Sequence, residues 1–104
     1  MKNQAKERVR VVERVQTGVR IEKRLLKVLK ALAEYHDITV GDLLEGIVLH
    51  AFDGLCPFQH ESLQRIKELK QIYNLDLDAS SSHRLIEANP EEVPRTTGGR
   101  KAKR

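Results

Sequence analysis

The sequence predicts a mainly helical fold with one N-terminal strand, and two patterns of apolar residues lead to this expectation. Between residues 15 and 21, apolar and polar side chains alternate, which is typical of a half-buried strand. After residue 22, apolar residues recur every three or four positions, which indicates amphipathic helices. No second alternating segment follows, so the strand is expected to lack a partner within its own chain.

The predicted strand has two different faces. One face is apolar and mostly β-branched: Val15, Thr17, Val19 and Ile21. The other face is polar or open: Gln16, Gly18 and Arg20. Residues 1–14 carry many basic side chains and are expected to form a basic arm in front of the strand.

Two helices are predicted directly after the strand. In the first, over residues 22–36, Leu25, Leu29 and Leu32 form an apolar stripe. The second is expected to begin at Thr39, a favourable N-cap, and to end before Gly54, a favourable C-terminal residue. Its expected buried residues all share one broad apolar face: Val40, Leu43, Leu44, Ile47, Val48, Ala51 and Phe52.

A third helix is expected from about Pro57, because proline is favoured in a first helical turn. Its apolar stripe consists of Leu63, Ile66, Leu69 and Tyr73. Residues 55–88 are interpreted as a helical extension, and residues 89–104 as a disordered basic tail. The stripe could pack on the rest of the protein, join two dimers on tandem sites, or bind another protein.

A lone strand and a small core both suggest that two chains associate. Unpaired backbone groups of a strand need partners, and about forty residues are too few to bury a sufficient core alone. Antiparallel pairing of two strands across a two-fold axis solves both problems. The sequence therefore predicts an intertwined homodimer with a two-stranded intermolecular ribbon.

The strand VQTGVRI, followed by two amphipathic helices with Thr39 and Val40 at the start of the second, resembles the ribbon-helix-helix family of Arc-, MetJ- and CopG-like DNA-binding proteins. The resemblance covers about residues 15–53, and it departs from the common pattern at the turn of residues 36–38, which lacks glycine. It implies that residues 15–54 form a domain for dimerisation and DNA binding.

The resemblance also implies roles for individual residues. The outward face of the strand would contact DNA bases through Gln16, Gly18 and Arg20. Glutamine pairs well with adenine and arginine with guanine, whereas Gly18 has no side chain to read a base. The N-terminus of the second helix would bind backbone phosphate through Thr39, Val40 and Gly41. Lys23 and Arg24, close behind the strand, are further candidates for phosphate contacts, although most such side chains are simply solvated.

Charge and composition limit the other classes of function. The chain has 104 residues and a net charge of +4, and its basic ends flank a mildly acidic middle. No phosphate-binding loop or catalytic constellation is recognisable, so we expect no enzyme and no cofactor. His50, Cys56 and His60 match no firm metal-ligand spacing, and no metal is expected. We expect no membrane association, and a single cysteine fits the reducing cytoplasm. A DNA-binding protein there is expected to be nucleoid-associated.

Three interpretations of function remain at this point. The first is a repressor-like transcriptional regulator that binds double-stranded DNA. The second is the antitoxin of a toxin–antitoxin pair, with a DNA-binding front and a toxin-binding C-terminal segment. The third is a protein-interaction module whose C-terminal helices bind a partner and whose basic ends are incidental.

Overall fold

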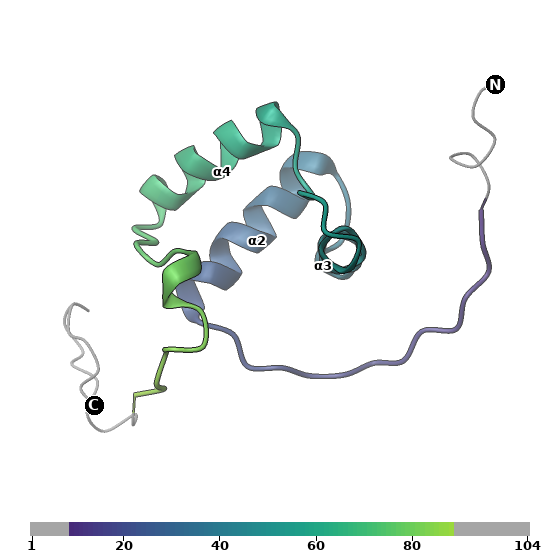
Figure 1. The fold of residues 1–104 in the computed structure, drawn as a ribbon, viewed down its shortest axis with the longest axis horizontal. Coiled ribbons are helices and arrows are strands. Elements are labelled where there is room, and N and C mark those ends of the chain that lie inside the picture. Colours follow the sequence, from purple (N-terminus) through teal and green to yellow (C-terminus); the bar gives the residue numbers. More distant parts are fainter. Residues whose placement is uncertain (1–8, 89–104) are drawn as a thin grey trace.

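The computed structural model describes residues 9–88, whose framework is three α-helices (Figure 1). They are α2 (Lys23–His36), α3 (Val40–Phe52) and α4 (His60–Ile72), followed by a single 3-10 turn, η1 (Ala79–Ser81). Within residues 9–88, no helix is long and apolar enough to span a bilayer. The start of the predicted basic arm, residues 1–8, and the tail predicted to be disordered, residues 89–104, lie outside the described residues.

The predicted N-terminal strand is wrong, and so is the ribbon built on it. Residues 9–22 form an extended segment that passes α3 on its way to α2, and the described residues contain no strand (Figure 1). The physical reason is that alternation alone does not make a strand, because a strand also needs a neighbour for its backbone hydrogen bonds. The two valines expected on its covered face, Val15 and Val19, are exposed instead.

The core of the molecule lies around α2, on which both α3 and α4 pack. Leu32 in the middle of α2 is the most buried large side chain, with 2% of its surface exposed. The other buried apolar residues come from all three helices and the segment after α4: Val28, Ala33, Leu43, Leu69 and Leu75. The three helices predicted from spacing are therefore present, although α4 begins at His60 and not near Pro57. Of its predicted stripe, Leu69 is buried and Ile66 and Tyr73 pack against the core, whereas Leu63 has 46% of its surface exposed.

Helix α3 buries less of its surface than its sequence predicts. Of its expected core residues, Leu43 is buried, and Val40, Leu44 and Ile47 are half-buried. The remaining three, Val48, Ala51 and Phe52, are exposed, and Phe52 has 80% of its surface exposed. The reason is that α2 covers only part of this broad apolar face, and these three side chains lie on the uncovered part.

All three helices end in the same kind of turn, in which one residue has a left-handed backbone. These residues are Asp37 (φ 60°), Gly54 (φ 73°) and Asn74 (φ 55°). In each turn an apolar residue follows, and its N–H donates to a carbonyl five residues earlier: Ile38 to Ala33 at 3.0 Å, Leu55 to His50 at 2.9 Å, and Leu75 to Lys70 at 2.8 Å. The predicted end of α3 at Gly54 is confirmed, and Asp37 replaces the missing glycine after α2.

We expect Asp37→Gly to stabilise the protein by about 1 kcal/mol, because glycine adopts positive φ without strain and an acidic group opposes the dipole at a helix C-terminus. Asp53→Gly is the matched control, since Asp53 has an ordinary φ of −89° at the end of α3. It should lose about 0.5–1 kcal/mol. Urea denaturation of both variants measures the difference, and a destabilised Asp37→Gly would contradict this explanation of the turn.

Candidate nucleic-acid interface

The predicted base-contacting residues lie on the exposed extended segment. Every residue from 9 to 20 is exposed, Gln16, Gly18 and Arg20 among them. A Cβ atom added to Gly18 would meet nothing within 4 Å, so a larger side chain would fit there in this chain. We call residues 9–24 the basic segment, because five of its side chains are basic and two are acidic. Its exposure leaves most of residues 9–20 accessible to a ligand.

Arg20 is held by a residue far away in the sequence. Its guanidinium makes a two-point contact with the carboxylate of Glu87, with Nε 3.1 Å from Oε1 and Nη2 bonded to Oε2. These hydrogen bonds, and then the attraction between the charges, raise the pKa of Arg20 and lower the pKa of Glu87. Both side chains remain largely exposed, at 81% and 64%.

Arg24 is more enclosed than Arg20 and has three partners. Its Nε donates to Glu22 Oε2 at 3.0 Å, and its Nη1 donates to Asn74 O at 2.9 Å and to Asp76 Oδ1 at 3.0 Å. The hydrogen bond to Glu22 is the largest effect raising the pKa of Arg24. Lys23, the first residue of α2, is exposed. Of the two predicted phosphate contacts here, Lys23 is the more open to solvent.

The predicted phosphate site at the start of α3 has the expected cap. Thr39 Oγ1 accepts a hydrogen bond from the N–H of Asp42 at 3.0 Å. Val40 and Gly41 occupy the first two helical positions, where backbone N–H groups have no partner within the helix. The carboxylate of Asp42 lies in the same first turn and adds a negative charge where a phosphate would bind. This terminus is therefore a weaker anion site than the cap alone suggests.

The structure places the two predicted groups at opposite ends of α2. Lys23 and Arg24 begin this helix and Thr39 follows its end, so about 20 Å of helix separates them. The basic segment links the two regions, because Arg14 lies beside α3 and makes two hydrogen bonds of 2.8 Å to Glu45. The hydrogen bond from Arg14 lowers the pKa of Glu45. Sequence reasoning missed this pair, since 31 residues separate its members and no pattern joins them.

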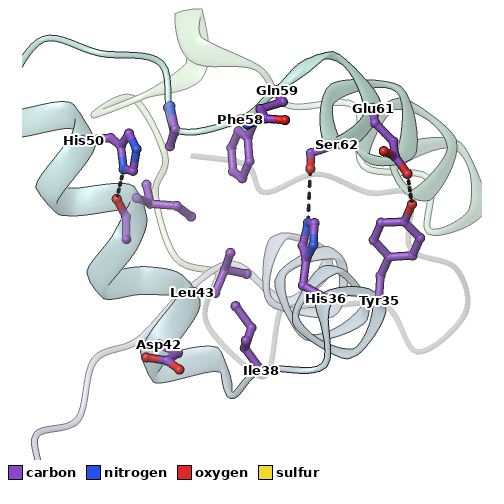
Figure 2. Close-up of a pocket in the computed structure, with 13 residues that line it drawn as sticks. Tyr35, His36, Ile38, Asp42, Leu43, His50, Phe58, Gln59, Glu61 and Ser62 are labelled. Atoms are coloured by element: carbon purple, nitrogen blue, oxygen red, sulfur yellow. Dashed lines mark hydrogen bonds between the residues drawn. The ribbon is translucent and has the colours of Figure 1, made fainter. Parts of the chain in front are cut away.

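A second feature is an open hollow of about 630 Å³ between the end of α2, α3 and the start of α4 (Figure 2). Leu43 and Phe58 line it beside the imidazoles of His36 and His50. His36 Nε2 lies 3.1 Å from the hydroxyl of Ser62, and His50 Nδ1 lies 2.8 Å from the carbonyl of Gly46.

The His36–Ser62 contact is best understood as a structural link between α2 and α4. Ser62 is buried, and no carboxylate among residues 9–88 hydrogen-bonds His36 to orient it as a catalytic base. A further polar link, from Tyr35 Oη to Glu61 Oε2 at 2.7 Å, joins the same two helices (Figure 2). These bonds satisfy polar groups at the helix interface and fix how α4 packs on α2.

His50, Cys56 and His60 do not form a metal site in the described part of the chain, where no three such side chains come together. Cys56 is exposed and its thiol donates to the carbonyl of Phe58 at 3.4 Å. Comparison of the chain with family models, with curated proteins and with solved structures found no match. Because neither the hollow nor these side chains form a recognisable site, the basic segment is the candidate functional site among residues 9–88.

Proposed function

We propose that this protein is a sequence-specific DNA-binding regulator of the repressor type, and that the basic segment makes its DNA contacts. The observation that carries the proposal is the exposure of residues 9–20 as an extended chain with arginines along it. An extended segment is narrow enough to follow a groove of duplex DNA, and its guanidinium groups match phosphate and guanine geometry. Such a protein would act in the cytoplasm, at the nucleoid.

Within the segment, Gln16 and Arg20 are the proposed base-contacting side chains. Each offers paired hydrogen-bonding groups that distinguish one base from the others. Lys23 and Arg24, which follow on α2, are proposed to bind phosphate, as is the α3 N-terminus at Thr39, Val40 and Gly41. Phosphate contacts hold the protein in register on the duplex, and base contacts select the sequence.

We further propose that two copies of the chain bind together. The outer side of α3 and the turn after it expose four large apolar side chains: Val48, Leu49, Phe52 and Leu55. Clustered apolar side chains on a small soluble domain mark an association surface. Such pairing would require no change in the structure of α3, because these side chains are already exposed.

The antitoxin interpretation receives less support than the regulator. A toxin-binding segment needs an apolar face available to the toxin, but Leu69 and Ile66 of the α4 stripe already pack in the core of the chain. The interaction-module interpretation draws on the same exposed apolar side chains of α3. It differs from the regulator in requiring no affinity for DNA, so a binding experiment separates the two.

The proposal predicts duplex binding that weakens steeply with salt. For three to five cationic contacts per chain, the plot of log affinity against log salt should have a slope of about −3 to −5 per chain. Fluorescence anisotropy with a labelled duplex measures this slope and the expected stoichiometry of two chains per site. Lys23→Ala should reduce the slope by about one unit, whereas Lys67→Ala on α4 should leave it unchanged. Absent or salt-independent duplex binding would contradict the regulator and favour the interaction module.

A further inference from the structure

The segment after α4 returns to the start of α2 and lies beside the basic segment (Figure 1). It is anchored at its beginning, where Leu75 is buried in the core and Leu77 packs against it. From there it presents two carboxylates to the basic segment. Asp76 bonds Arg24, and Glu87 bonds Arg20 at two points.

The two contacts engage arginines to which the proposed function gives DNA contacts. A carboxylate and a phosphate compete for the same guanidinium donors, because both accept paired N–H hydrogen bonds in one plane. A bound carboxylate also cancels the charge that would attract the DNA backbone. DNA can engage Arg20 fully only after Glu87 has left it.

The end of this segment is held loosely enough to leave. Leu85 and Ile86, the two apolar residues that precede Glu87, have 53% and 61% of their surfaces exposed and contribute little to the core. The Arg20–Glu87 pair is itself largely exposed, so water and salt weaken it. Residues 82–88 can therefore separate from Arg20 while Leu75 keeps its place in the core.

We propose that residues 74–88 act as an internal competitor of DNA, in which Asp76 and Glu87 occupy Arg24 and Arg20 and lower the affinity for duplex. This inference rests on the proposed function. Binding of DNA exchanges each carboxylate for a DNA acceptor and releases the end of the segment.

The test is a pair of variants of the full chain titrated with a fluorescent duplex at about 50 mM salt, where phosphate contacts are strong. One exposed ion pair shifts an equilibrium by about fivefold at most, so the double variant Glu87→Gln, Asp76→Asn should bind about tenfold more tightly than the parent. The matched control, Glu34→Gln with Asp53→Asn, removes two exposed carboxylates on other parts of the chain. It should change the affinity by less than about twofold, because salt screens distant charges.

A second comparison tests whether the effect passes through Arg20. In the Arg20→Ala background, Glu87→Gln should no longer increase the affinity. Equal gains in the double variant and its control, no gain in either, or a gain that persists without Arg20 would each overturn the competitor. If no variant binds duplex, the proposed function fails and the competitor fails with it. Binding without the predicted difference refutes the competitor alone.

Discussion

Replacing Leu32 by alanine is expected to lower the free energy of unfolding by about 2–5 kcal/mol. Leu32 lies at the centre of α2, where both other helices pack, and only 2% of its surface is exposed. The substitution removes apolar surface from the core and leaves a cavity that the surrounding helices cannot fully close. A small domain has about 5–15 kcal/mol of total stability, so this variant loses a large part of it.

Thermal and urea denaturation, followed by circular dichroism, measure this loss. In a domain of this size, each 1 kcal/mol lowers the Tm by about 4–8 °C. Leu85→Ala is the matched control, because it makes the same substitution at a side chain with 53% exposure outside the helices. It should cost about 0.5 kcal/mol or less. Similar losses in the two variants would contradict a core centred on α2.

The second large effect is expected at Arg20 and Gln16. Arg20→Ala and Gln16→Ala should each lose roughly 1–3 kcal/mol per subunit of the discrimination between the correct base and the wrong ones, because each removes a paired contact to a base edge. Both residues are exposed on the extended segment, outside the core, so the helical signal should be unchanged. Binding isotherms on a preferred duplex and on a scrambled duplex measure the discrimination as a ratio of affinities.

Lys23→Ala provides the contrast with these two variants. Lys23 begins α2 and is proposed to contact phosphate, so its loss should weaken preferred and scrambled duplexes by the same factor. If Arg20→Ala and Gln16→Ala also weakened all duplexes equally, their role in reading bases would be wrong. They would then be phosphate contacts like Lys23.

The helices could be predicted from the sequence because their signals are local. The stripe that contains Leu29 and Leu32, the cap at Thr39 and the glycine at position 54 each depend on neighbours within a few residues. The turn at Asp37 was harder to predict, because the left-handed residue there is not glycine. The turn is defined by the hydrogen bond that the N–H of Ile38 donates to the carbonyl of Ala33. An apolar residue at position 38, directly after Asp37, was the signal in the sequence that could have indicated it.

The strand and the burial of α3 could not be predicted, because both depend on what lies beside them. The alternation from Val15 to Ile21 predicts which residues would share a face of a strand, but it does not indicate whether a neighbouring strand is present to pair with it. The broad apolar face of α3 likewise shows which side of the helix can be buried, yet α2 covers only part of that face. Phe52 and Val48 are exposed for that reason.

The ion pairs of the candidate interface could not be predicted from the sequence either. Arg20 and Glu87 are 67 residues apart, and Arg24 and Asp76 are 52 apart. Charged residues at such separations pair only because the segment after α4 returns to α2. The resemblance made Arg20 a candidate on the outward face of the alternating segment, and Arg24 was a candidate because it follows that segment closely. Neither the resemblance nor this position indicated that carboxylates already bind these two side chains.

The measurement that tests the central claim most directly is selection of binding sites from random duplex DNA by the full chain. A sequence-specific regulator that binds as two copies should enrich one motif made of two related half-sites. Arg20→Ala and Gln16→Ala should each lose preference at a different position of that motif. Recovery of duplexes with no common motif, at affinities that depend only on salt, would contradict sequence-specific recognition by the basic segment.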